Sequence, residues 1–178
     1  MTLKMKTIFY WSPCLNKVGT VKSTVNSAIA LSKYSREKYK VKIINTCGEW
    51  DEYSDVFKKY NIGIIEFKYK FFSYLPKNGF LKSRISYLVI ILFSFFPLYN
   101  LLKKDKPEFF IMHLLTSLPI ILNNLFNFQT KFILRISGFP KLNILRKFLW
   151  RNSSKNLFKI TCPTKDSLTQ LKNQNIFD

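Results

Sequence analysis

The chain has 178 residues, 47% of them hydrophobic, which suits one domain with a sizeable core and argues against intrinsic disorder. Lysine and arginine number 29 against 10 acidic residues, so the formal net charge is +19. Such a charge favours phosphates, nucleic acid or an anionic lipid surface as partners. A bland explanation is also open, because Lys, Asn, Ile and Phe are all abundant, as an AT-biased genome would produce.

The cysteine, histidine and N-terminal patterns narrow the chemistry and the location. Cys14, Cys47 and Cys162 lie far apart with no C-x-x-C spacing, which argues against a disulfide framework or zinc site and fits a reducing cytoplasm. His113 is the only histidine, so a metal cluster or a Ser-His-Asp hydrolase is poorly supported, and we expect no metal and no cofactor. The apolar run 8–11 is too short for a signal-peptide core, so no export is indicated.

Six short apolar runs rich in β-branched and aromatic residues alternate with segments of helical spacing. Near-continuous hydrophobicity is typical of strands buried on both faces, and strands separated by helices imply right-handed crossovers in a parallel sheet. We therefore predict an α/β, doubly wound, mostly parallel sheet with helices on both faces, which is a Rossmann-like fold. The strands are expected at 7–11, 41–45, 63–67, 108–113, 131–136 and 157–162.

The first helix is predicted over 20–35, because apolar residues recur there at helical spacing and form one face: Val21, Val25, Ala28 and Ile29. The loop before it delivers Gly19 to the helix N-terminus, where backbone N–H groups attract phosphate or sugar oxygens. The dinucleotide and P-loop glycine fingerprints are absent, so a nicotinamide enzyme or NTPase is not supported. A turn glycine with no ligand is the alternative interpretation of Gly19.

The segment 85–102 is the least typical, with 18 uncharged residues flanked by basic ones. It could be a crossover helix packed on the sheet, a helix lying in a membrane interface, or a membrane span. The strand order needs a crossover helix here, and Pro97 would kink or end a span, so the first interpretation is favoured. The preceding segment 67–84 mixes six aromatic with five basic residues, as an interfacial patch would. The membrane-surface candidates are Lys68, Lys70, Phe71, Phe72, Lys82 and Arg84.

Two polar residues interrupt the later apolar runs. His113 closes the fourth predicted strand, at the sheet end where ligands usually bind, although a lone histidine is often structural. Arg135 lies inside the fifth run, and burying it unpaired is too costly, so it must face a pocket or a carboxylate. The alternative for Arg135 is an ion pair at the sheet edge.

The last helix is expected to begin at Thr164, whose hydroxyl can cap the free backbone N–H groups. Asp166 is favourable in its first turn, and Leu168 and Leu171 are expected to face inward. We find no internal repeat, Gly/Ser linker or second domain in the sequence, so residues 1–178 are interpreted as a single domain.

These segments together resemble the N-terminal domain of the family 4 retaining glycosyltransferases, whose GT-B architecture has two Rossmann-like domains. The likeness covers nearly the whole chain and is most specific in the R-x-S-G-x-P stretch and in the Cys162-Pro163-Thr164 helix entry. Gly19 matches the second glycine of the family's Gly-Gly loop, whereas Val18 stands at the first. The stretches that carry it are Ser12-Pro13, the glycine loop, IMHLLTSLP, ILRISGFPKLNILRKFLW and KITCPTKDSLTQLKNQNIFD.

The resemblance implies an acceptor-binding domain of an enzyme that transfers sugar from a nucleotide sugar to a lipid-linked or envelope glycan. It implies a cytoplasmic enzyme at the inner membrane face, with an anionic membrane surface and a C-terminal donor-binding domain, absent from this chain, as partners. By the same resemblance His113 is the catalytic candidate, and this chain alone is expected to be inactive. The implied substrate-binding residues are Gly19, Thr20, Arg135, Ser137 and Gly138.

Two non-enzymatic interpretations compete with the glycosyltransferase hypothesis. The charge and aromatic residues suit a nucleic-acid-binding module, but the order of strands and helices matches no common one, so no nucleic-acid partner is expected. A small membrane-anchored protein is the other alternative, and it depends on segment 85–102.

Overall fold

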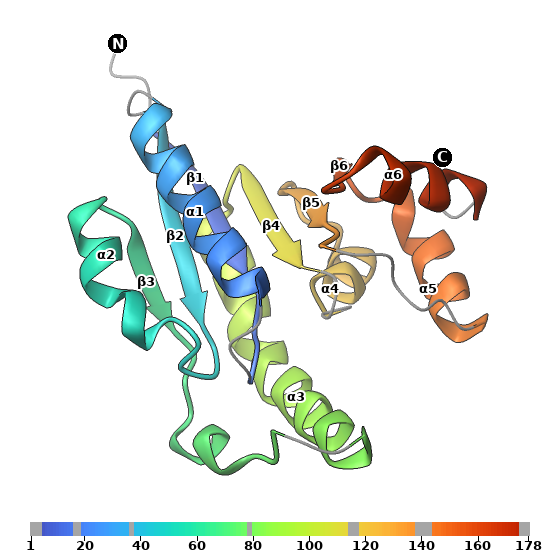
Figure 1. Ribbon diagram of the computed structural model, residues 1–178, viewed down its shortest axis with the longest axis horizontal. Helices are drawn as coiled ribbons and strands as arrows, with labels where there is room; N and C mark the ends of the chain where they lie inside the picture. The colour runs from blue at the N-terminus through green and yellow to red at the C-terminus, as the bar shows by residue number, and fades with distance from the viewer. Residues whose placement is uncertain are drawn as a thin grey trace.

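The computed structural model describes residues 5–15, 19–35, 38–77, 80–113, 118–137 and 144–174. Its centre is a six-stranded parallel sheet with the strand order β3-β2-β1-β4-β5-β6 (Figure 1). The predicted α/β, doubly wound, Rossmann-like fold is therefore confirmed. The strands span Lys6–Trp11 (β1), Tyr39–Asn45 (β2), Gly63–Glu66 (β3), Phe109–His113 (β4), Lys131–Arg135 (β5) and Lys159–Thr161 (β6).

Each of the six predicted apolar runs contains one strand, with ends that differ by a few residues. The strands are parallel because the connections between them, most of them helical, return the chain to the same end of the sheet. These helices are Gly19–Tyr34 (α1), Ser54–Lys59 (α2), Phe80–Asp105 (α3), Leu118–Phe126 (α4), Ile144–Ser154 (α5) and Lys165–Asn173 (α6), with 3-10 turns at Asp51–Tyr53 (η1) and Lys70–Tyr74 (η2).

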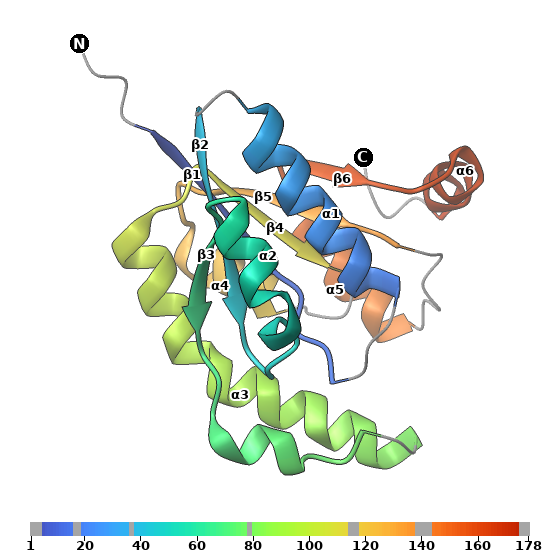
Figure 2. The ribbon, with the colours of Figure 1, turned by 60° about the vertical axis from the view of Figure 1, so that its left-hand side comes forward.

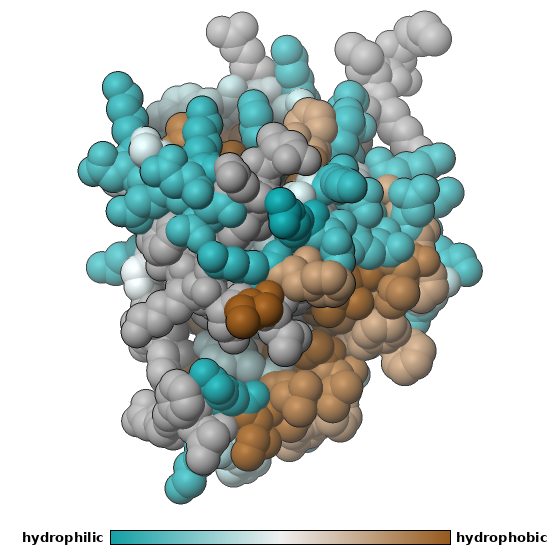
Figure 3. Space-filling view, turned by 90° about the vertical axis from the view of Figure 1, so that its right-hand side faces the viewer, coloured by the Kyte–Doolittle hydropathy of each residue, from teal (hydrophilic) through white to brown (hydrophobic). Residues whose placement is uncertain are grey.

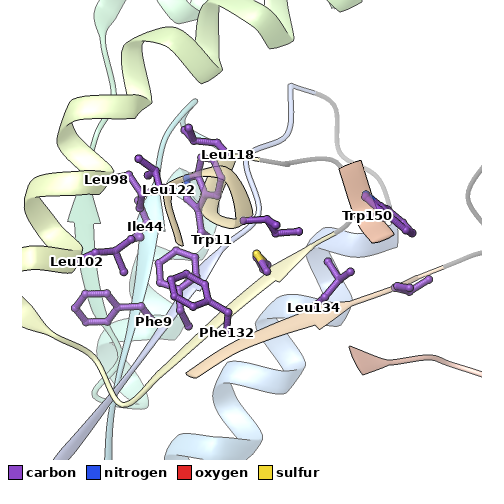
Figure 4. Packing of buried hydrophobic residues seen from close by; sticks show 14 of the residues in the cluster. Phe9, Trp11, Ile44, Leu98, Leu102, Leu118, Leu122, Phe132, Leu134 and Trp150 are labelled. Atoms are coloured by element: carbon purple, nitrogen blue, oxygen red, sulfur yellow. The ribbon is translucent and has the colours of Figure 1, made fainter. Parts of the chain in front are cut away.

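The two faces of the sheet are covered by different helices. Helices α1 and α2 lie on one face, and α3, α4 and α5 lie on the other (Figures 1 and 2). Alternate residues of β1 serve the two layers, since Tyr10 packs under α1 while Phe9 and Trp11 enter the α3 layer. The α3 layer is the larger aromatic and aliphatic core, and Leu98 and Trp150 bring α3 and α5 into it (Figure 4).

The first and last helices begin where the sequence predicts. The inward face of α1 buries Val21, Val25 and Ala28, with Ile29 half-buried. At α6 the Thr164 hydroxyl accepts a hydrogen bond from the Ser167 backbone N–H at 3.1 Å, which confirms the predicted cap. Leu171 is buried as expected, but Leu168 is 44% exposed, so the prediction for Leu168 is wrong. Residue 168 lies three positions before 171, and only one of the two reaches the core.

Helix α3 forms the crossover between β3 and β4 and packs on the sheet through Leu98 and Leu102, while Ile90 is also buried. Pro97 does not end it, contrary to one expectation, because Leu98 and Leu102 beyond the proline are held in the core. Among the described residues, α3 is the one helix long and apolar enough to cross a membrane by length and composition. Its packing on the sheet supports the crossover interpretation.

Of the expected membrane-surface set, Phe72 is buried and Lys68 is exposed but paired. Phe72 is only 1% exposed, beneath the rings of Tyr69 and Phe71, so it supports the surface and does not contact it. Lys68 forms an ion pair with Asp51, which also accepts a hydrogen bond from Asn45. The prediction for Phe72 is wrong because the 3-10 turn η2 turns this ring inward.

Candidate functional site

The carboxyl ends of β4 and β5 meet the first turns of α1. His113 and Arg135 are the last residues of their strands and are direct neighbours across the parallel ladder. Gly19 opens α1, which begins after the carboxyl end of β1. The structure thus places Gly19, His113 and Arg135 at one end of the sheet, where parallel α/β folds bind ligands.

Arg135 is half-buried and held by α1. Its Nη2 donates a hydrogen bond to the Ser23 hydroxyl at 2.7 Å. No carboxylate of the described residues forms an ion pair with it. Strand β5 also lies between β4 and β6, so the alternative of an ion pair at the sheet edge does not hold. The guanidinium is a positive charge in the wall of a pocket, and within the described part of the chain Ser23 takes one of its five N–H donors.

His113 is 4% exposed and sits beneath α1, where its Nε2 lies 2.8 Å from the Thr24 hydroxyl. Burial, and secondarily the nearby Arg135 charge, lowers the pKa of His113 to about 4. The imidazole is therefore neutral near pH 7. The residues that line the main pocket do not include it. His113 thus supports the pocket from below through Thr24, and a direct catalytic role stays a prediction.

A pocket of about 740 Å³ opens on the α1 face of the sheet beside these residues. The first half of α1 contributes a row of hydroxyls, Thr20, Ser23 and Ser27, spaced three or four residues apart along one helix face. Tyr10 donates to or accepts from Ser27 at 2.8 Å, and burial raises the pKa of Tyr10 to about 12, so its hydroxyl stays neutral. The pocket is lined by Tyr10, Gly19, Thr20, Ser23, Ser27, Leu31, Ile111, Ile133, Arg135, Ile136, Ser137, Thr161, Cys162 and Pro163.

Four of the expected substrate-binding residues line this pocket together: Gly19, Thr20, Arg135 and Ser137. Gly138, the fifth, lies outside the described residues. A Cβ built on Gly19 would meet no atom within 4 Å, so within the described structure space alone does not demand glycine there. That open space lies beside the N-terminus of α1, where an incoming ligand could reach the backbone N–H groups.

The sequence analysis missed the polar residues of α1 that complete the site. Ser23 and Thr24 hold Arg135 and His113 respectively, and Ser27 pairs with Tyr10. The signal was present, because hydroxyls recur at 20, 23, 24 and 27, which fall on one side of a helix. The apolar spacing identified only the core face of α1, at Val21, Val25, Ala28 and Ile29, and this neighbouring polar side was left without a role.

The pocket chemistry suits binding more than proton transfer. Its described lining offers one guanidinium, several hydroxyls and aliphatic side chains, and contains no Asp, Glu or His. Among the described residues no group of three His, Cys, Asp or Glu side chains could hold a metal ion. A ligand with phosphate or many hydroxyl groups matches this lining, because guanidinium groups suit oxyanions and hydroxyl groups donate and accept hydrogen bonds.

Comparison with known proteins identifies the fold. No family model and no curated protein sequence matches the chain. A candidate UDP-N-acetylglucosamine 2-epimerase from Listeria monocytogenes superposes with a TM-score of 0.60 and 12% identity, over 97% of this chain and 42% of that one. Another UDP-N-acetylglucosamine 2-epimerase gives a TM-score of 0.55 and 14% identity, over 97% and 43%. The likeness shows a Rossmann-like fold of the GT-B type, and the chain spans less than half the length of these neighbours.

Proposed function

We propose that this chain is the acceptor-side domain of a glycosyltransferase that moves a sugar from a nucleotide sugar to a lipid-linked or envelope glycan. The enzyme would act in the cytoplasm, at the inner face of the membrane. The observation that carries the proposal is Arg135, fixed by Ser23 in the wall of a hydroxyl-lined pocket, with no ion-pair partner among the described residues.

The transfer reaction needs positive charge near the leaving group. As the bond between sugar and diphosphate breaks, charge grows on the phosphate oxygens, and donors aimed at those oxygens lower the barrier. Arg135 and the backbone N–H groups at Gly19 are the donors on this side of the site. Thr20, Ser137 and Ser27 would orient hydroxyls of the sugar or acceptor. His113, neutral and beneath α1, would hold Thr24 and so the angle of α1 at the pocket.

We further propose that recognition of the nucleotide sugar comes from a second domain. The chain spans 42% and 43% of the two epimerase structures compared above, so a donor-binding half would account for the rest of such an architecture. Without that half, donor and acceptor are not held together, a term worth roughly 7–11 kcal/mol in oriented reactions. These 178 residues alone are therefore expected to fold but not to transfer sugar.

The pocket can be tested by binding without turnover. Isotope-labelled protein is titrated with pyrophosphate and with UDP-N-acetylglucosamine while amide signals are followed by NMR. We expect signals of the first turn of α1 and of Ser137 to shift, and Arg135→Met to weaken binding by about tenfold or more.

Lys131→Met is the matched control, because Lys131 begins the same strand at the opposite end and pairs with Glu108 on the surface. It should leave binding within about twofold. Equal weakening by both substitutions would mean that the net charge, not the pocket, attracts the ligand, and the proposal would fail. Transfer of radiolabelled sugar to membrane extract by this chain alone, abolished in His113→Ala, would refute the half-enzyme hypothesis.

A second candidate is an epimerase half, favoured by the activity named for both structural neighbours. Epimerisation needs groups that remove and return a proton, and the described pocket lining has no carboxylate or histidine to do so. In the proposed sugar transfer, this domain needs to supply only ligand binding and positive charge. Pairing the chain with its donor-binding domain and analysing the products from UDP-N-acetylglucosamine separates the two: an epimerised nucleotide sugar formed without acceptor would favour the second candidate.

A further inference from the structure

Helix α3 is apolar on its outer side as well as on its inner side. The inner side buries Ile90, Leu98 and Leu102, together with Ser86 and Ser94 at 0% and 1% exposure, while other large apolar side chains face outward. Four of these recur at i, i+3, i+7 and i+11 and so form one line on the helix, about 16 Å long. The outer stripe, as we call it, consists of Ile85, Leu88, Leu92 and Phe96, at 56–71% exposure.

An aromatic group widens the stripe on one side. Phe93, 46% exposed, packs edge-to-face against Tyr69 and Phe71, with ring centroids 5.6 and 4.9 Å apart. Phe72 supports these rings from beneath. Figure 3 shows hydrophobic side chains gathered on the lower part of the molecule, where α3 lies, and hydrophilic ones above. The apolar surface is thus continuous over α3 and η2.

Basic residues flank both ends of this surface, and the acidic residues next to it, Asp51 and Glu52, lie beside Lys68, which pairs with Asp51. Residues 67–104 contain seven basic residues and no acidic one. Lys70, Lys82 and Arg84 are exposed near the N-terminal end of α3, and Lys103 and Lys104 are exposed near its C-terminal end. Basic residues at both ends of an apolar helix face, with aromatic rings beside it, match an anionic lipid surface, in which rings sit at headgroup level and lysines meet phosphates.

We propose that the outer stripe, with Tyr69 and Phe71, docks the protein onto an anionic bilayer by inserting in the plane of the leaflet. A second copy of the chain fits less well, because a symmetric pair would bring the same basic residues face to face. A span is also disfavoured, since Leu98 and Leu102 hold the C-terminal half of α3 in the main core, and leaving the sheet would expose that core.

Docking in this way would orient the candidate site. The N-terminal part of α3, which follows the carboxyl end of β3, extends beyond the strand ends in both ribbon views (Figures 1 and 2). The stripe therefore lies toward the same end of the sheet as Gly19 and Arg135. If the proposed transferase function holds, a lipid-linked acceptor would reach the pocket from the membrane to which the stripe is docked.

Vesicle binding by the full chain tests the docking surface without any activity. We expect co-sedimentation with phosphatidylglycerol–phosphatidylcholine vesicles that weakens with salt, and little with phosphatidylcholine alone. Leu88→Ser/Leu92→Ser should weaken binding by at least about tenfold. Leu168→Ser on α6, an exposed leucine away from α3, is the matched control and should bind within about twofold of wild type. In Leu92→Trp, vesicles should shift indole fluorescence to the blue.

Several outcomes overturn the proposal. Wild-type-like binding by the double serine variant, equal binding to neutral and anionic vesicles, or no fluorescence shift in Leu92→Trp would each do so. Concentration-dependent dimerisation without vesicle binding, lost in the double variant, would assign the stripe to a second copy. Failure of the pocket is separable, because Arg135→Met should keep vesicle binding while losing pyrophosphate, and the double serine variant should show the reverse.

Discussion

Helices α1 and α3 lie on opposite faces of one sheet and both bury apolar residues, but α3 also exposes large apolar residues on its outer side. Helix α1 buries Val21, Val25 and Ala28, and its buried Thr24 is held by His113. Helix α3 buries two serines and exposes four large apolar residues. Packing on the sheet explains α1 completely, because its apolar face is its inner face. It explains only one side of α3.

The difference shows that a crossover helix can pack on the sheet through a few residues, here Leu98 and Leu102, while its opposite side remains apolar and exposed. A line of exposed apolar side chains of this length lowers solubility and favours association with other molecules. The seven basic residues of segment 67–104 are consistent with the proposed docking to an anionic membrane. The predictions below test whether the two sides of α3, and the polar contact under α1, behave as this comparison requires.

The largest expected effect separates the two sides of α3 with one residue type. Leu98→Ala removes a side chain at 0% exposure from the main core and should lower the free energy of unfolding by about 2–5 kcal/mol. Leu92→Ala, at 61% exposure on the outer stripe, should change it by no more than about 0.5 kcal/mol. Urea unfolding followed by circular dichroism measures both. Similar losses would mean that the outer stripe is part of a core and not a surface.

The next effect concerns the polar contact under α1 and appears as a pH dependence. The pKa of His113 is about 4 when folded, against 6.5 for an ordinary histidine, so the unfolded chain binds more protons between these values. Stability is therefore full above pH 6.5 and falls as the pH drops toward 4, by up to about 3 kcal/mol. In His113→Gln this slope should be lost.

The titration of Glu49 changes stability with pH in the opposite direction, so wild type has to be compared with His113→Gln. Burial raises the pKa of its carboxyl to about 7, although backbone N–H groups of Cys47 and Thr46 lower it. The folded state then holds an extra proton between the ordinary value of 4.5 and 7, so this contribution falls as pH rises through that window. Only the difference between wild type and His113→Gln isolates the histidine. Parallel pH profiles of the two proteins would contradict the neutral, buried state of His113.

The strands could be predicted from the sequence, but the contacts of the helices could not. Short runs of β-branched and aromatic residues between segments of helical spacing indicate buried strands. The site could be predicted in part, because His113 and Arg135 stand at strand ends and parallel topology brings strand ends together. Their contacts with Thr24 and Ser23 could not be predicted, because these contacts depend on how α1 is rotated on the sheet.

The rotation of α3 could not be predicted either. Residues 85–102 carry no charge and are mostly apolar on every side of the helix. Their periodicity therefore does not indicate which side packs on the sheet. The rotation depends on how side chains pack in the folded protein, where Leu98 and Leu102 enter the main core. Phe72 was assigned to the surface for the same reason, since composition does not reveal that a 3-10 turn tucks one ring of a cluster inward.

The smallest expected effect distinguishes the two buried serines of α3. Ser86 donates from its hydroxyl to the Pro76 carbonyl at 2.9 Å and lies 3.1 Å from that of Lys82, so it ties the segment before the helix to its first turns. Ser94 is equally buried, but its hydroxyl has no hydrogen-bond partner among the described residues. A paired hydroxyl stabilises, whereas an unpaired buried one costs desolvation free energy with no return.

Alanine at each position should therefore act with opposite sign. Ser86→Ala should lower the free energy of unfolding by about 0.5–1.5 kcal/mol, and Ser94→Ala should raise it by about 0.5–1 kcal/mol, helped by the higher helix propensity of alanine. The two substitutions remove the same atom from the same helix, so size and propensity cancel between them. Urea unfolding of both variants beside wild type gives the comparison. If Ser94→Ala is as destabilising as Ser86→Ala, the Ser94 hydroxyl has a partner in solution, and the inner side of α3 carries a polar contact like that of Thr24 in α1.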